Sequence, residues 1–140
     1  MLDTNICSYI IKKRPLKILD KFKSLRNEDY VISSITVSEL KYWVARNQKL
    51  HQLSQNSGSS KINEQVINDF LHHLLVMDFN SHAAGMYGEL RAELEIKGTL
   101  IGNMDLMIAA HALSLGTILV TNNMKEFKRI PKLKLENWVH

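Results

Sequence analysis

The sequence predicts an α/β fold of three layers, α/β/α, with helices on both faces of a short central parallel sheet. Short apolar or β-branched segments alternate along the chain with longer segments of helical periodicity. Strands separated by helices favour parallel pairing through crossover connections, and helices then cover both faces of the sheet. A chain of 140 residues is long enough for a proper core and too short for two domains, so we expect a single domain over residues 1–140.

Each strand is predicted from a short apolar run. The predicted strands are residues 1–2, 31–33, 75–79 and 117–121, with 133–135 as a further candidate. Residues 117–121 give the clearest strand pattern, whereas residues 1–2 form only the end of a very short strand. Asp3 follows that first strand directly, and ligand crevices in open α/β sheets lie outside the carboxyl ends of the strands.

The helices are predicted from apolar spacing and from residues that begin or end helices. They cover about residues 5–11, 15–25, 35–46, 61–74, 81–97 and 103–115. Pro15 suits a first helical turn, Asn80 is a cap candidate, and Gly98 and Gly116 suit helix ends. The small polar residues around Gly58 predict a surface loop between two helices.

Composition and charge indicate a globular protein with a basic surface. The net charge is +4, and no apolar run approaches the roughly 20 residues that cross a bilayer, so we expect no membrane association. The first residues lack a signal-peptide pattern, and a single cysteine, Cys7, fits the reducing cytoplasm. We expect Cys7 to be a small buried hydrophobe. A basic surface attracts polyphosphate backbones, although charge alone does not make a nuclease.

Three acidic residues, Asp3, Glu39 and Asp105, lie within a few residues of apolar stretches, and each has a structural alternative. Asp3 suits a helix cap, although Thr4 and Asn5 beside it add further oxygen atoms. Glu39 completes a capping box, in which Thr36 would cap the helix that follows. Asp105 lies in a first helical turn with Asn103 as the expected cap, and the helix dipole stabilises its ionised form. Carboxylates gathered in one pocket repel each other unless a divalent cation neutralises them.

Other polar residues have ordinary interpretations. Asn122 and Asn123 suit a turn after a buried strand. His111 lies in an apolar helix and is expected to be a packed or surface histidine, not a ligand, and the remaining histidines lack the spacing of a helical zinc site. Trp43 and Trp138 are expected to be packing or contact residues.

Together the motifs resemble a PIN domain, and within that family the VapC toxins of bacterial type II toxin–antitoxin systems. The matching blocks are residues 1–6 (MLDTNI), 33–40 (SSITVSEL), 87–94 (YGELRAEL), 101–112 (IGNMDLMIAAHA) and 119–127 (LVTNNMKEF). The segment LENW at 135–138 is similar to the enteric branch, which is specific for initiator tRNA, tRNA(fMet). The resemblance covers nearly the whole chain with its blocks in order.

The resemblance implies a Mg²⁺-dependent endoribonuclease, with Mn²⁺ able to substitute, that cleaves the anticodon stem-loop of initiator tRNA. It implies Asp3, Glu39 and Asp105 as catalytic residues, with Asp3 and Asp105 as the metal ligands. The supporting polar residues would be Thr4, Asn5, Thr121 and Asn123. The implied partners are a cognate VapB-like antitoxin and a second copy of the chain, in a complex that binds operator DNA through the antitoxin.

Two departures from the family pattern leave alternatives open. Asn123 stands where PIN domains often carry a fourth acid, so both one and two bound ions remain possible. The loop around Gly58 is longer than usual, which affects the geometry of partner binding. A PIN scaffold that binds RNA or protein without cutting is the alternative function. A haloacid-dehalogenase-type phosphatase is rejected, because Asn5 stands where its second aspartate is required.

Overall fold

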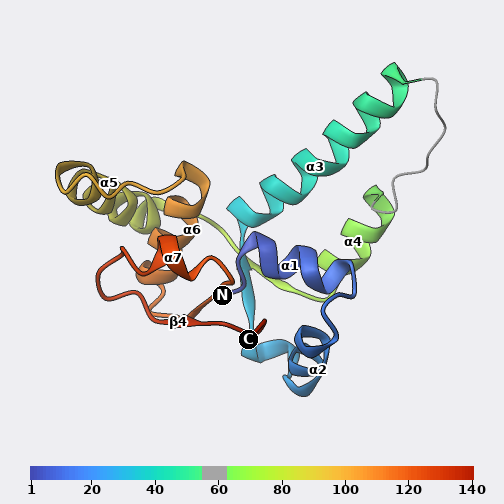
Figure 1. Ribbon diagram of the computed structural model, residues 1–140, viewed down its shortest axis with the longest axis horizontal. Helices are drawn as coiled ribbons and strands as arrows, with labels where there is room; N and C mark the ends of the chain where they lie inside the picture. The colour runs from blue at the N-terminus through green and yellow to red at the C-terminus, as the bar shows by residue number, and fades with distance from the viewer. Residues whose placement is uncertain (55–62) are drawn as a thin grey trace.

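The structure, a computed structural model, describes residues 1–54 and 63–140 of the chain (Figure 1). Short strands alternate with helices throughout. The elements are α1 (Thr4–Ile11), α2 (Leu16–Ser24), the 3-10 turn η1 (Asn27–Asp29), β1 (Val31–Ser33), α3 (Ser34–Leu53), α4 (Glu64–His72), β2 (Leu75–Met77), α5 (Ser81–Ile96), α6 (Asn103–Ser114), β3 (Leu119–Val120), α7 (Met124–Phe127) and β4 (Leu135–Glu136).

The strands form one parallel sheet in which a single residue, Leu2, takes the place of the central strand. The order across the sheet is β2, β1, Leu2, β3 and β4. Leu2 bridges to Ile32 of β1 and to Val120 of β3. The Leu2 amide donates to the carbonyl of Val31 at 2.9 Å, and the Val120 amide donates to the carbonyl of Met1 at 2.8 Å. The middle of the sheet therefore ends directly before the first acidic residue.

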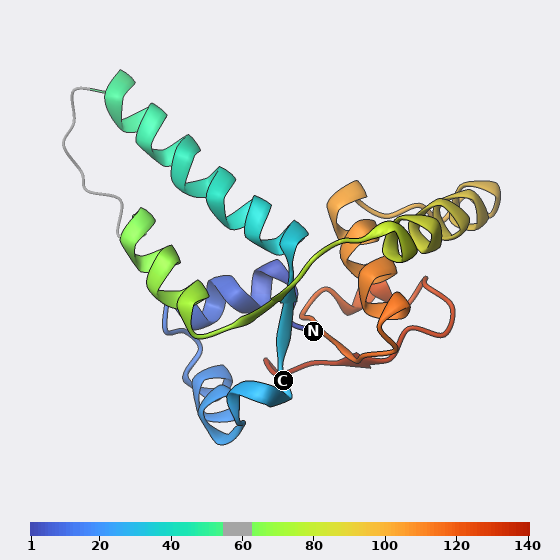
Figure 2. The same cartoon turned by 180° about the vertical axis from the view of Figure 1, so that it is seen from behind.

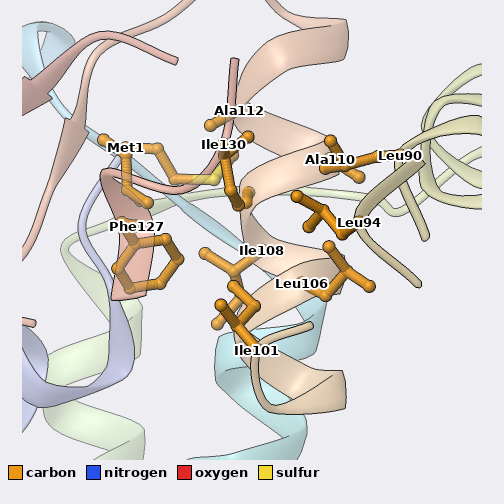
Figure 3. Packing of buried hydrophobic residues seen from close by; sticks show 12 residues of the cluster. Met1, Leu90, Leu94, Ile101, Leu106, Ile108, Ala110, Ala112, Phe127 and Ile130 are labelled. Carbon is orange, nitrogen blue, oxygen red and sulfur yellow. The ribbon is translucent and has the colours of Figure 1, made fainter. Parts of the chain in front are cut away.

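Alternation along the strands builds two cores, one on each face of the sheet. Met1 and Leu119 belong to a core formed with α5, α6 and α7. Leu2 and Val120, the next residues along, belong to a core formed mainly with α1, α2, α3 and α4. Successive side chains of a strand point to opposite faces, which explains this division. Figure 3 shows the first core, where side chains of α5 and α7 surround α6.

The helices are arranged so that two pairs project from the sheet in different directions. In Figures 1 and 2, α3 and α4 extend to one side, and α5 with α6 lies on the other side. The carboxyl ends of the strands, the first turn of α3 and the first turn of α6 meet between them. None of the helices in the described residues is long and apolar enough to cross a membrane.

The predicted three-layer α/β/α architecture is confirmed, and the corrections concern the lengths of elements and the short helix α7, which was not predicted. β2 covers only Leu75–Met77 of the predicted 75–79, and β3 covers only Leu119–Val120 of the predicted 117–121. The last strand is Leu135–Glu136, not 133–135. The parallel register pairs Leu119 with Leu135, which fixes where the last strand begins.

Helix α3 continues seven residues past the predicted end at Arg46, to Leu53. Residues 47–53 contain no glycine or proline and include several residues of good helix propensity, which explains the extension. The predicted loop at 55–60, with Gly58, and the first residues of the predicted helix 61–74 lie outside the described residues. The described part of that helix is α4.

Candidate active site

The first acidic residue is held by the start of α1 and by the end of β3. Asp3 is the N-cap of α1, and its Oδ1 accepts a hydrogen bond from the amide of Ile6 at 2.7 Å. Its Oδ2 accepts from the hydroxyl of Thr121, the residue that follows β3. The amide of Asn123 donates in turn to the Thr121 hydroxyl oxygen at 2.9 Å. Asp3 is 2% exposed, so it is a cap and also an oriented carboxylate.

Glu39 lies beside this aspartate but has no capping role. The expected capping box, with Thr36 as the cap, is wrong: α3 begins at Ser34, and the hydroxyl of Ser33 accepts from the amide of Ile35 at 3.0 Å. Strand β1 ends at Ser33, so a capping side chain is present three residues earlier than predicted. Glu39 therefore lies in the second turn, where its Oε1 accepts from the hydroxyl of Thr4 at 2.5 Å.

The third acidic residue, Asp105, lies in the first turn of α6 as predicted. The expected cap was Asn103, but the N-cap is Gly102, and no side chain caps the helix. The Asn103 oxygen is already engaged, because it accepts a hydrogen bond from the hydroxyl of Tyr87 in α5. The amide group of Asn123 donates to Oδ2 of Asp105 at 3.4 Å, which places Asn123 in the site.

The three acidic residues share one region, because hydrogen bonds link Asp3 to Asp105 through Thr121 and Asn123, and Thr4, next to Asp3, bonds to Glu39. Burial raises the pKa of Asp3 to about 6, against the hydrogen bonds from Thr121 and Ile6, and the charges of Asp105 and Glu39 raise this pKa further. The charges of Glu39 in α3 and of Asp105 in α6 thus act on the pKa of Asp3, which lies at the start of α1. Carboxylates distant in sequence are brought together, as the positions of the strand ends predict.

A fourth acidic residue, Glu126, acts on Asp105 through its charge. Burial raises the pKa of Asp105 to about 6, the charges of Glu39 and Glu126 add to this rise, and the hydrogen bond from Asn123 opposes it. Glu126 lies in α7, three residues after Asn123, and was not among the predicted site residues. The missed signal is its spacing: Glu126, six residues after the end of β3, lies in the first turn of a short helix that begins at Met124.

The other polar residues of the sequence lie as follows. Asn5 is exposed, and its side chain makes no hydrogen bond within residues 1–54 and 63–140. His111 is packed, which is one of the two predicted possibilities: it is 1% exposed, its Nδ1 lies 2.8 Å from the Ser33 hydroxyl, and burial lowers its pKa. Cys7 is fully buried, and burial raises its thiol pKa. Trp138 is buried in the second core, and the ring of Trp43 lies 6.0 Å from the ammonium of a lysine.

The donor set suits a hard divalent cation. Asp3, Glu39, Asp105 and Glu126 offer only carboxylate oxygens, the ligands that Mg²⁺ and Mn²⁺ prefer. In the part of the chain that the structure describes, none of the four forms an ion pair with a lysine or arginine. No group of three histidine, cysteine or acidic side chains among these residues converges closely enough to be a complete metal site. The site is thus an uncompensated acidic cluster, whose side chains would have to close around an ion.

The raised pKa values predict how pH affects the metal-free protein. A folded pKa of about 6, against about 3.9 when unfolded, means that folded Asp3 keeps its proton over a range where the unfolded chain has lost it. The stability contributed by the protonated form is complete below about pH 4 and is lost as pH rises through about 6. In EDTA, we expect Asp3 alone to lower the free energy of unfolding by on the order of 2 kcal/mol between pH 4 and pH 7.

Urea unfolding at several pH values would measure this loss, with Asp3→Asn as the matched variant. The variant should lack that part of the pH dependence, because its side chain does not titrate. Added Mg²⁺ should raise the unfolding midpoint at pH 7 more than at pH 4. Identical pH profiles for the two proteins would show that Asp3 does not titrate in this range.

Comparisons with known proteins agree with the fold. The family model of the PIN domain matches residues 1–133, and the chain therefore belongs to the PIN-domain family. Ribonuclease VapC2 of Rickettsia felis is 47% identical over 139 residues, which are 99% of this chain and 96% of that protein. The tRNA(fMet)-specific endonuclease VapC of Salmonella typhimurium is 41% identical over 138 residues, with the same shares covered.

A solved structure supports the same grouping. The structure of VapBC2 from Rickettsia felis bound to a DNA fragment from their promoter matches with a TM-score of 0.81 at 45% identity, over 99% of this chain and 97% of that chain. The resemblance to the VapC ribonucleases, predicted from the sequence blocks, is thereby confirmed.

Proposed function

We propose that this protein is the toxin of a VapBC-type toxin–antitoxin system and acts in the cytoplasm as a Mg²⁺-dependent endoribonuclease, with Mn²⁺ able to substitute. The observation that carries the proposal is the cluster of Asp3, Glu39 and Asp105 at the carboxyl edge of the sheet. The charges of Asp105 and Glu39 raise the pKa of Asp3, and the charge of Glu39 also raises the pKa of Asp105. Such a cluster is electrostatically costly without a cation and gives a divalent ion several oxygen ligands.

Asp3 and Asp105 are the proposed ligands of the ion, and their neighbours fix their positions. The Thr121 hydroxyl and the Ile6 amide hold the two oxygens of Asp3, and the Asn123 amide group holds one oxygen of Asp105. Hydrogen bonds of this kind orient metal ligands and keep them ionised. A divalent cation supplies neutralisation of phosphate charge and a more acidic water as the nucleophile.

Glu39 is the proposed acceptor for the proton of the attacking water. The Thr4 hydroxyl orients its carboxylate, and one oxygen remains available for a water molecule. When water attacks phosphorus, the bond from phosphorus to the 3′ oxygen breaks. The products would then carry a 5′-phosphate and a 3′-hydroxyl, because the ribose 2′-hydroxyl takes no part. Glu126 adds negative charge near Asp105, which favours ion binding there.

The relatives suggest the substrate and the partners. One relative is named a tRNA(fMet)-specific endonuclease, and we propose the anticodon stem-loop of initiator tRNA as the substrate. Single-stranded loops present unpaired bases that proteins read more readily than duplex RNA. The solved VapBC2 complex is bound to promoter DNA, and we propose a VapB-like antitoxin that binds operator DNA in complex with this toxin. A homodimer of the toxin within that complex is part of the proposal.

The test is cleavage of total RNA by the purified protein with Mg²⁺, with Mn²⁺ or with EDTA, followed by sequencing of 5′-phosphate ends. We expect metal-dependent ends concentrated in the anticodon loop of initiator tRNA. Asp105→Asn is the matched control, because it keeps the size of the side chain and removes its charge. RNA retention without cleavage, equal in both proteins, would instead favour a PIN scaffold that binds RNA.

A further inference from the structure

A chain of hydrogen bonds on the surface links α5 to the first turn of α6. The hydroxyl of Tyr87 donates to Oδ1 of Asn103, and Nη1 of Arg91 donates to the same hydroxyl at 2.9 Å. Tyr87 packs its ring against the first core, whose members include Leu90 and Leu94 of the same helix (Figure 3). The ring is therefore held in place, and its hydroxyl oxygen, as a hydrogen-bond acceptor, fixes the position of the Arg91 guanidinium.

This arrangement leaves donors available to a ligand. A guanidinium has five N–H donors, of which one is bonded to Tyr87. The Nε of Arg91 lies 4.0 Å from an oxygen of Glu95, and the described residues provide no other acceptor for the group. The amide nitrogen of Asn103 also has no acceptor among them. The exposed Arg91 and Asn103 thus present several N–H groups to solvent at the tip of α6.

The N–H donors of Arg91 and Asn103 lie near the acidic cluster, because Asn103 and Asp105 share the first turn of α6. Asn103 and Asp105 belong to the same first turn of α6 but are two positions apart, so their side chains leave opposite sides of a helix that is about 10–12 Å across. The four acids have no lysine or arginine partner in the described part of the chain. RNA that reaches them must carry phosphates past this negative charge, and a positive group beside the path reduces that repulsion.

We propose that Arg91, held by Tyr87 and assisted by the amide of Asn103, binds an RNA phosphate that flanks the cleaved bond, across the tip of α6 from Asp105. The inference rests on the proposed ribonuclease function and assigns a role to the 87–94 block. Arginine suits this role, because its planar fork binds two phosphate oxygens at once. The surface hydrogen bonds contribute little to folding, so their arrangement has more consequence for binding than for stability.

The test compares Arg91→Gln, Arg91→Lys and Tyr87→Phe with Lys23→Gln, which removes one exposed charge from α2 on the other face of the sheet (Figure 1). Binding of a fluorescent RNA hairpin with the anticodon loop of initiator tRNA is measured in EDTA over a range of salt. We expect Arg91→Gln to weaken binding about tenfold and to reduce the slope of log affinity against log salt by about 0.7, one phosphate contact on single-stranded RNA.

The other variants should fall in a defined order. Arg91→Lys should keep most of the slope and lose part of the affinity, Tyr87→Phe should lose less than Arg91→Gln, and Lys23→Gln should keep the wild-type slope. With Mg²⁺, Arg91→Gln should raise KM more than it lowers kcat. Thermal unfolding of all four is expected to match the wild type, which separates binding from misfolding.

Wild-type affinity and slope in Arg91→Gln would overturn the inference while leaving the ribonuclease proposal intact. The same holds if Arg91→Gln weakens only the assembly with an antitoxin, because Arg91 would then contact an acidic protein segment. If the wild-type protein neither binds nor cleaves the RNA hairpin or total RNA, the proposed function itself fails.

Discussion

An Asp3→Asn variant is expected to lose RNA cleavage by more than about 100-fold and, at pH 4 in EDTA, to unfold at nearly the wild-type urea concentration. Weakening the groups that support a metal ligand already costs about 10–100-fold, so removing the charge of a ligand should cost more. The amide oxygen of asparagine can still accept from the Ile6 amide, as Asp3 does. The hydroxyl of Thr121 can reverse its role and accept from the new amide nitrogen.

Asp3→Ala is the informative comparison, because Asp3 is both a cap and a proposed ligand. Alanine removes the cap of α1 and leaves the buried Thr121 hydroxyl without its acceptor, so we expect a loss of about 1–2 kcal/mol in stability. Both variants should be inactive, and at pH 4 in EDTA only Asp3→Ala should be clearly destabilised. Near wild-type cleavage by Asp3→Asn would remove Asp3 from the catalytic set and leave it as a helix cap.

The second large effect is expected at Glu39. Glu39→Gln should reduce cleavage by about 100-fold, within the 10²–10⁴-fold that a positioned acid or base contributes. The free energy of unfolding should change little, because glutamine offers an oxygen to the Thr4 hydroxyl and Glu39 caps no helix. Initial rates on the RNA hairpin and urea unfolding of the same preparations would measure the two effects.

A matched control is Glu89→Gln, an exposed acid on α5 outside the acidic cluster. It makes the same chemical change and should leave cleavage near the wild-type rate. If Glu39→Gln retains wild-type activity, the proton acceptor lies elsewhere, and Glu126 is the next candidate because its charge also acts on Asp105.

The sequence predicted the layers and the meeting of three acids, because both follow from local patterns. Apolar strands that alternate with helices fix parallel pairing, and parallel strands end at a common edge. Asp3 follows Leu2 directly, so its position depends only on where the first strand lies in the sheet. Strand lengths could not be predicted in the same way, since β3 and β4 depend on the register between residues far apart in the chain.

The errors at the helix starts have a common cause. Several polar residues near each start can act as a cap, and tertiary contacts decide among them. Ser33 caps α3 in place of Thr36, and it also lies 2.8 Å from a nitrogen of His111 in α6. Asn103 bonds to Tyr87 of another helix and so does not cap α6. Glu126 was missed because its short helix, α7, has too few residues to show a periodic pattern.

The direct junction of β1 with α3 has a consequence for how this protein can change in evolution. Ser33 ends the strand and Ser34 begins the helix, with no residue between them. One residue inserted there would turn the helix by about 100° relative to the sheet. Glu39 would then point away from the Thr4 hydroxyl that orients it. Lineages of this protein should therefore tolerate substitutions at the junction far better than insertions or deletions, because the number of residues there determines where the Glu39 side chain points.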